Sequence, residues 1–323
     1  MTPTKQGSIH LFRVAGIDLY LHWTWFLVAY YAINQRVGRY TSPVWNVLEY
    51  LALFAIVLMH EFGHSLACRQ VGGRADQIVL WPLGGVAYVD PPDRPGAMLW
   101  SLAAGPLVNV ALLPVLYLVN VLARTTGVFD AVPDAYRLLN SITAINLVLL
   151  IFNLLPIYPL DGGQILRSLL WFVVGRAWSM TIATGLGLVG VVGLVVLAVL
   201  ARSVWIVVLS GFILLNCWNG LRYGLQLVRM TRAPRRKGFA CPVCGAAPPV
   251  GNHWTCPDCR KTFDIFEAQP VCPQCGTAAV ATRCLECGNR SPILAWRPPA
   301  ETAVSPVQWP FDSSSAGHSP SLN

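Results

Sequence analysis

An unbroken apolar run, Tyr50–Met59, leads directly into the segment His60–His64, which reads HEFGH. The run is typical of a membrane-spanning helix, and the motif continues that helix. Ionisable side chains at bilayer depth are rare and usually functional, so this feature restricts the fold strongly. On a helix, His60 and His64 share one face, where both imidazoles can bind one zinc ion. Glu61 lies beside them and can act as general base on a zinc-bound water.

The composition supports a membrane protein. The chain has 323 residues, of which 54% are hydrophobic and 12% are charged, whereas a soluble globular chain carries roughly 25% charged residues. One soluble core cannot bury so much apolar surface. The net charge of +8 indicates basic cytoplasmic loops and contact with anionic lipid before it indicates nucleic acid.

We therefore expect an α-helical polytopic membrane protein of about six transmembrane helices, with a small membrane-edge β-hairpin and a small C-terminal zinc-ribbon domain. The expected spans are residues 19–33, 47–68, 98–122, 138–155, 181–200 and 203–225. The apolar segment 165–174 is short for a span and should continue the fourth helix. The distribution of Arg and Lys predicts a multi-pass protein of the cell membrane with both termini cytoplasmic, and a first span that is retained.

A possible hairpin lies between the second and third spans. Two strand-like runs, Ile78–Trp81 and Val86–Val89, flank Pro82 and the pair Gly84-Gly85. This pattern predicts a hairpin or bent loop at the membrane edge. It is equally compatible with an ordinary connector and with an edge strand that holds an extended substrate by backbone hydrogen bonds.

Two histidines leave a tetrahedral zinc one protein ligand short, with water as the fourth. Asp161 is the best candidate for the third ligand, because it falls inside an apolar segment at a break that contains Pro156 and Pro159. Gly162-Gly163 follows it and permits tight turning. Non-helical backbone at membrane depth persists only when it packs in protein or lines a wet cavity, which suits such a site.

These motifs resemble those of the site-2 protease family of intramembrane zinc metalloproteases. The segment 60–64 matches the family's first motif, and residues 153–162 match its N-x-x-P-x-x-x-L-D-G motif. Residues 83–85 resemble its glycine-containing loop, and residues 104–109 its G-P-x-x-N segment. The resemblance covers roughly residues 8–228 and, without a PDZ insertion, is closest to the sporulation-type branch.

The resemblance implies zinc ligands His60, His64 and Asp161, with Glu61 as general base and Asn153 orienting substrate or stabilising the oxyanion. Asn109 fits a helix-packing role equally well. His22 is more simply an interfacial residue among tryptophans than a site residue.

The function that follows is intramembrane zinc endopeptidase activity on membrane-tethered substrates. The expected partner is a membrane protein whose transmembrane helix is destabilised, within the lipid bilayer. Two alternatives stay open. One is a catalytically silent membrane scaffold that acts through its zinc ribbons, and the other is a zinc transporter that uses the same three ligands as a relay.

Eight of the ten cysteines form four C-x-x-C pairs near the C-terminus: Cys241, Cys244, Cys256, Cys259, Cys272, Cys275, Cys284 and Cys287. The spacing predicts two structural zinc ions in small ribbons, most simply paired in sequence order, in preference to disulfides. Acidic and basic residues balance across this segment, so we expect a cytoplasmic protein partner and no nucleic acid.

The expected domains are residues 1–228 for the metalloprotease domain, 229–240 for a basic juxtamembrane linker, 241–290 for a double zinc ribbon and 291–323 for a Pro/Ser-rich disordered tail. The linker's basic run is typical of a topology and lipid anchor. The ribbon has too few apolar residues for a core of its own, so zinc is expected to fold it.

Overall fold

The computed structural model describes residues 7–36, 38–81, 84–267, 270–287 and 289–296. The chain divides into two compact units, Met1–Ala233 and Pro234–Asn323. Five helices of the first unit are long and apolar enough to cross a membrane. They are α2 (Pro43–Gln70), α3 (Pro95–Thr125), α5 (Pro133–Leu154), α6 (Asp161–Leu200) and α7 (Val204–Arg232). The protein is therefore a mostly helical membrane protein, as predicted.

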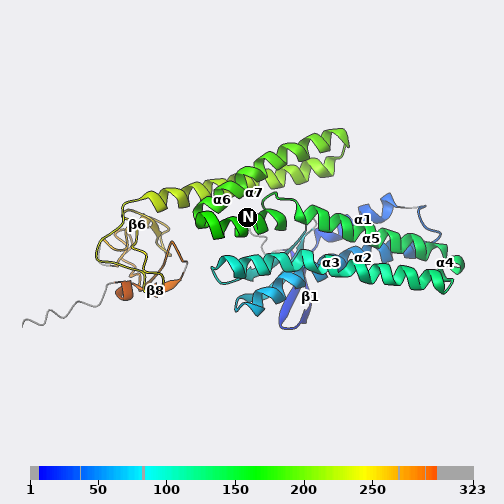
Figure 1. Ribbon diagram of the computed structural model, residues 1–323, viewed down its shortest axis with the longest axis horizontal. Coiled ribbons are helices and arrows are strands. Elements are labelled where there is room, and N and C mark those ends of the chain that lie inside the picture. Colours follow the sequence, from blue (N-terminus) through cyan, green and yellow to red (C-terminus); the bar gives the residue numbers. More distant parts are fainter. Residues whose placement is uncertain (1–6, 37, 82–83, 268–269, 288, 297–323) are drawn as a thin grey trace, which may run out of the picture. The chain divides into compact units, whose positions relative to one another are not determined.

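The long helices of the first unit form a group of α2, α3 and α5 and a pair of α6 and α7, and α3 also packs against α6 (Figure 1). Helix α2 packs against α3 and α5, and α6 packs along α7. Helix α2 begins where the Ser42 hydroxyl accepts a hydrogen bond from the Val44 amide, with Pro43 in the first turn, a sequence that suits a helix start. Besides these helices, α1 (Thr24–Gln35) and α4 (Val128–Ala131) are short.

A four-stranded sheet covers part of α2. Its order is β1 (Ser8–Val14), β2 (Ile17–His22), β3 (Arg74–Trp81) and β4 (Gly84–Asp90). Strands β3 and β4 pair antiparallel, which confirms the predicted hairpin, while β2 runs parallel to β3. The buried face of the sheet, including Ile17, Leu19, Ile78 and Leu80, packs against Val57 of α2.

The predicted first span, residues 19–33, was wrong in its first part. Residues 17–22 form β2, and the helix that follows has only 12 residues, short of the roughly 20 that a span needs. In β2, Ile17 and Leu19 point into the core, while Asp18 and Tyr20, which alternate with them, are less buried. This period of two marks a strand, but the neighbouring apolar residues of α1 merge with it into one apolar run.

The fourth and fifth spans are divided differently from the prediction. Helix α5 ends at Leu154, and residues 155–160 form a non-helical break that contains Pro156 and Pro159. Segment 165–174 therefore does not continue the fourth span. It belongs to α6, which runs on through a kink at Gly175, where φ is 78° and ψ is 171°. Proline removes a backbone donor and restricts φ, so the break comes before Asp161 and not after it.

The second unit is small and contains two two-stranded sheets. These are β5 (Trp254–Thr255) with β6 (Thr262–Phe263), and β7 (Ala281–Arg283) with β8 (Arg290–Pro292). A 3₁₀ helix, η1 (Ile293–Trp296), follows β8. The core joins buried cysteines to a few large side chains: Trp254, Phe263, Ile265, Phe266, Ile293 and Trp296.

Two predicted boundaries near this unit were wrong. Helix α7 runs to Arg232, so the first four residues of the expected linker are helical. The expected disordered tail began at residue 291, yet residues 291–296 are folded and the Trp296 side chain is 2% exposed. Burial of the Trp296 ring in the ribbon core explains this difference. Residues 297–323 of that tail lie outside the described residues.

Candidate functional site

Three predicted metal ligands come together within the first unit. His60 and His64 project from α2, and Asp161 is the first residue of α6. Asp161 Oδ2 lies 3.0 Å from His60 Nε2 and 3.4 Å from His64 Nε2, and the two Nε2 atoms are 3.2 Å apart. Two ligands of a tetrahedral zinc, each about 2.0–2.1 Å from the ion, lie roughly 3.3 Å apart. The donor set and its spacing therefore fit a zinc ion.

The two imidazoles are oriented by neighbours on α3. His60 Nδ1 donates to Asn109 Oδ1 at 2.6 Å, and His64 Nδ1 donates to the Ser101 carbonyl oxygen at 2.8 Å. A hydrogen bond at Nδ1 fixes the tautomer, so each Nε2 keeps its lone pair for a metal. Asn109 in turn donates to Asn146 Oδ1 on α5 at 2.8 Å. All five of these residues are buried.

Close approach of α3 to α2 depends on Gly105. A Cβ atom at this position would lie 2.3 Å from His64 Nε2 and 2.9 Å from His60 Nε2. These separations are far below contact distance for non-bonded atoms. The absence of a side chain at Gly105 therefore leaves room for the imidazoles to adopt the observed positions.

Glu61 lies between α2 and the edge of the sheet. Its Oε2 accepts a hydrogen bond from the Ala87 amide of β4 at 3.0 Å. A Cβ atom at Gly85 would lie 2.3 Å from Glu61 Cγ, so the strand can approach this carboxylate only with glycine there. The Glu61 side chain is buried, yet it lines the same cavity as His60 and Asp161.

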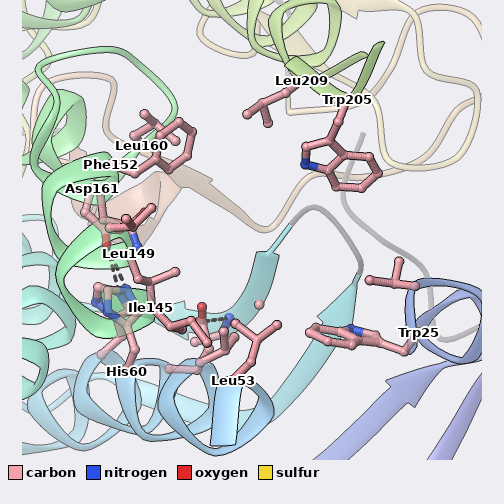
Figure 2. Close-up of a pocket in the computed structure, with 18 of the residues that line it drawn as sticks. Trp25, Leu53, His60, Ile145, Leu149, Phe152, Leu160, Asp161, Trp205 and Leu209 are labelled. Carbon is pink, nitrogen blue, oxygen red and sulfur yellow. Dashed lines mark hydrogen bonds and ion pairs between the residues drawn. The ribbon is translucent and has the colours of Figure 1, made fainter. Parts of the chain in front are cut away.

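A cavity of about 960 Å³ opens beside these residues. Figure 2 shows Asp161 facing His60 at one side of the cavity, with Trp25 and Trp205 across from them. Its walls are mostly apolar, which suits an apolar ligand fixed by a few polar groups. Asn153 of α5 also lines the cavity. Its side chain is therefore accessible to a ligand bound there.

The sequence missed two residues that support the ligands, Ser101 and Asn146. Both are buried polar side chains in long apolar helices. A polar residue within a span usually bonds a neighbouring helix, as the Asn146 side chain and the Ser101 hydroxyl do. The contact to His64 Nδ1 comes from the backbone carbonyl oxygen of Ser101, which the residue type does not indicate. Asn109 fits its expected helix-packing role, since it joins α3 to α5, and it also holds His60, which the sequence did not predict.

His22 lies apart from the metal ligands, as the simpler interpretation expects. Its ring stacks on Trp81 with ring centroids 4.3 Å apart, and its Nδ1 lies 2.6 Å from Thr24 Oγ1. These contacts join the end of β2 to the end of β3. His22 is thus a packing residue of the sheet.

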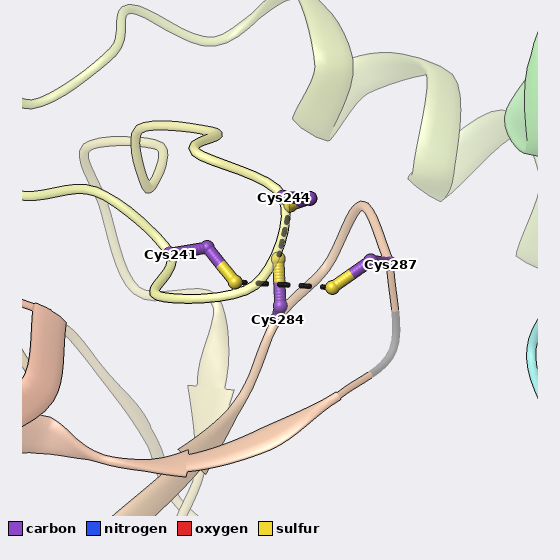
Figure 3. A group of neighbouring side chains, drawn as sticks. All are labelled: Cys241, Cys244, Cys284 and Cys287. Carbon is purple, nitrogen blue, oxygen red and sulfur yellow. Dashed lines mark hydrogen bonds between the residues drawn. The ribbon is translucent and has the colours of Figure 1, made fainter.

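The eight paired cysteines form two clusters in the second unit, each with its four sulfur atoms within 4.8 Å of one another. Cys241 Sγ lies 3.8 Å from Cys287 Sγ, and Cys244 Sγ lies 3.7 Å from Cys284 Sγ (Figure 3). Sulfur atoms around a tetrahedral zinc lie roughly 3.8 Å apart, whereas a disulfide brings them to about 2.05 Å. The geometry fits zinc and not disulfides.

The pairing of the knuckles differs from the predicted sequence order. One cluster joins the first and fourth knuckles, and the other joins the second and third: Cys241, Cys244, Cys284 and Cys287, then Cys256, Cys259, Cys272 and Cys275. The segments that flank the four knuckles meet, since the Ala240 amide donates to the Trp296 carbonyl oxygen at 2.8 Å. That contact brings the outer knuckles together and leaves the inner two to pair.

Comparisons with known proteins agree with the motifs. The model of peptidase family M50 matches residues 49–137 and 131–197. A zinc metalloprotease of Methanocaldococcus jannaschii is 34% identical over 64% of this chain and 58% of its own length. Stage IV sporulation protein FB of Bacillus subtilis is 33% identical over 36% of this chain and 38% of its own. The chain thus spans less than two thirds of these curated relatives.

A solved structure is also similar. It is a site-2 protease from Methanocaldococcus jannaschii, 30% identical in sequence, with a TM-score of 0.49. The match covers 67% of this chain and 95% of that one.

Proposed function

The chain belongs to peptidase family M50, and from this premise we propose that it is an intramembrane zinc endopeptidase of the site-2 protease type. It would hydrolyse peptide bonds within transmembrane segments of membrane-tethered substrates. One observation carries the proposal. His60, His64 and Asp161 present three ligand atoms at tetrahedral spacing, beside the Glu61 carboxylate, on the wall of an apolar cavity.

His60, His64 and Asp161 would hold the zinc ion. When bound there, zinc polarises the scissile carbonyl and lowers the pKa of water to about 7 in favourable sites. Asn109 and Ser101 keep the imidazoles in the required tautomer through their Nδ1 hydrogen bonds.

Glu61 would be the general base. The Ala87 amide holds its Oε2, which fixes the carboxylate while its second oxygen can take a proton from the attacking water. Glu61 can then deliver that proton to the leaving amine, because one positioned carboxylate can serve both steps. This role needs a carboxylate close to the metal ligands, and α2 supplies it next to His60.

Strand β4 would hold the substrate in extended form. It is the last strand of the sheet, and its alternate residues Gly85, Ala87 and Val89 line the cavity. Backbone groups on an edge strand can pair with an added strand. Such pairing suits proteolysis, since a helical substrate keeps its carbonyl groups in internal hydrogen bonds. A transmembrane helix weakened by Gly, Pro or Asn would be the preferred substrate.

Asn153 would orient that substrate or stabilise the oxyanion through its amide group. It lies near the end of α5, two residues before the break that leads to Asp161. Membrane-tethered regulators and remnant signal peptides are the substrate classes that we propose. The protein would lie in the cell membrane as a multi-pass protein, with its C-terminal unit in the cytoplasm.

The second unit would bind two structural zinc ions and a cytoplasmic protein partner. Each cluster offers four thiols at zinc spacing. Ion pairs such as Arg236 with Asp264, at 2.6 Å, neutralise charges within the unit. A nucleic-acid surface needs an excess of basic side chains, so this unit suits a protein partner better.

Replacing the base tests the proposal. Glu61→Gln should reduce cleavage of a transmembrane model peptide by a factor of about 10²–10⁴, while the zinc content stays unchanged. Glu267→Gln is the matched control, because Glu267 lies on the surface of the second unit. Full cleavage by Glu61→Gln would contradict the assignment. Loss of zinc in that variant would give Glu61 a structural role instead.

A further inference from the structure

The cavity extends well beyond the metal ligands. On α2 its lining residues Glu49, Leu53 and Val57 precede His60 at intervals of three or four. On α5 the lining residues from Ser141 to Asn153 follow the same spacing. Residues at this spacing share one helix face. Two facing stripes therefore form a continuous groove, from the loop between α1 and α2 to the catalytic residues.

The loop end of this groove is charged. Arg36, Arg39, Glu49 and Ser141 all line it. Arg36 forms an ion pair with buried Glu49, and the Tyr40 hydroxyl donates to Glu49 Oε2 at 2.8 Å. Both carboxylate oxygens of Glu49 are thus engaged by groups other than Arg39.

The second carboxylate at this end is also engaged. Asp134 accepts hydrogen bonds from the Thr41 amide and hydroxyl at Oδ2, and Arg137 lies 2.7 Å from its Oδ1. Arg39 Nη2 donates instead to the neutral Ser141 hydroxyl at 2.8 Å. Burial lowers the pKa of Arg36, and the charge of Arg39 lowers it further. Because Glu49 pairs with Arg36 and Asp134 with Arg137, the charge of Arg39 is in excess at this end of the groove.

We propose that Arg39 determines specificity by binding an acidic side chain of the substrate at the loop end of the groove. This inference rests on the proposed function. An arginine fork matches a carboxylate in shape and charge. The apolar stripe between Arg39 and the catalytic residues suits an apolar segment. The preferred substrate thus combines an apolar stretch with one Glu or Asp at a set distance from the scissile bond.

The helices set that distance. About eleven residues of α2 separate Glu49 from His60, which is roughly 16 Å along the helix. A substrate covers this length with about five extended residues, or about eleven helical ones. Only the part near the scissile bond must unwind. The acidic residue therefore lies between about five and eleven residues from the bond that is cut.

Peptide binding tests the proposal without catalysis. Zinc-loaded Glu61→Gln protein in phosphatidylcholine nanodiscs would be titrated with labelled transmembrane peptides that carry Glu, Gln or Lys at each position in this window. The Glu peptide should bind about tenfold tighter than the Gln peptide at the best position. Added Arg39→Gln should remove this difference, and added Arg39→Glu should shift the preference to Lys. Arg124→Gln, at the end of α3, is the control and should keep the preference for Glu.

The outcomes separate three cases. A preference for Glu that survives Arg39→Gln overturns the proposal. If Arg39→Gln weakens every peptide equally, and only when phosphatidylglycerol is present, Arg39 contacts lipid headgroups and the proposal is also overturned. If the Arg39-dependent preference is found but protein with Glu61 intact cuts no peptide, the subsite stands and the proposed protease activity fails.

Discussion

His60, His64 and Asp161 are held by two long helices of the first unit, whereas each group of four cysteines is held by loops of the second. The histidines keep their orientation through Asn109 and Ser101, which are themselves packed between helices. The cysteines have only short strands and a few large apolar side chains around them. The first site is preorganised by its protein surroundings, whereas under the proposed function the second unit would need its metal ions as part of its core.

This contrast fits the two proposed tasks, which are catalysis in the first unit and structural support in the second. A catalytic site must keep its ligands in place while substrate and water enter and leave, which requires a rigid supporting shell. A structural site has all four positions closed by protein ligands, so it contributes to folding directly.

Removal of metal should produce the largest difference in folding between the two units. Treatment of the full chain with a strong chelator should unfold the second unit, because structural zinc contributes an apparent 10–16 kcal/mol of binding free energy to such units at about pH 7. Helices α2, α3 and α5 should stay folded. Hydrogen exchange measured on the intact protein checks both parts. Equal protection of the second unit with and without zinc would contradict the contrast.

The second-largest effect is expected when a side chain is added next to the ligands of the first site. Gly105→Ala places a methyl group where the imidazoles lie, and displacement of ligands by about 1 Å can cost a hundredfold in rate. We therefore expect about a hundredfold loss of peptide cleavage with the helices intact. Gly193→Ala is the matched control, because no atom of the described residues lies within 4 Å of the added Cβ atom. Unchanged cleavage by Gly105→Ala would mean that α3 can move away without cost.

Removal of a supporting side chain should have the smallest effect. Asn109→Ala deletes the hydrogen bond to His60 Nδ1, and loss of such a partner typically lowers metal affinity by about 10- to 100-fold. Competition with a chelator of known affinity measures this change. Asn216→Ala is the control, since the Asn216 amide donates to the Phe212 carbonyl oxygen of its own helix. Equal affinities in the two variants would show that the imidazole needs no support from Asn109.

Local patterns in the sequence predicted most of the first site. The spacing of His60 and His64 fixes their shared face, and the proline break before Asp161 predicts an irregular backbone at membrane depth. The structure brings these residues together. The hairpin of β3 and β4 was also predicted from neighbouring residues.

Contacts between distant segments were not predictable in this way. Strand β2 pairs with β3, about sixty residues later in the chain, and its apolar residues looked like the start of a span. The nested order of the cysteine knuckles depends on the meeting of Ala240 with Trp296. The spacing of C-x-x-C pairs carries no information on which knuckles meet.

The zinc content of purified protein tests the central claim most directly, with Asp161→Ala compared with the wild type. The wild type should hold three zinc ions, one for each group of ligands, and Asp161→Ala should hold two while its second unit stays folded. If Asp161→Ala loses one zinc ion and also loses cleavage activity, the intramembrane zinc site is established. An unchanged zinc content would contradict the account, because Asp161 would then not be a required ligand.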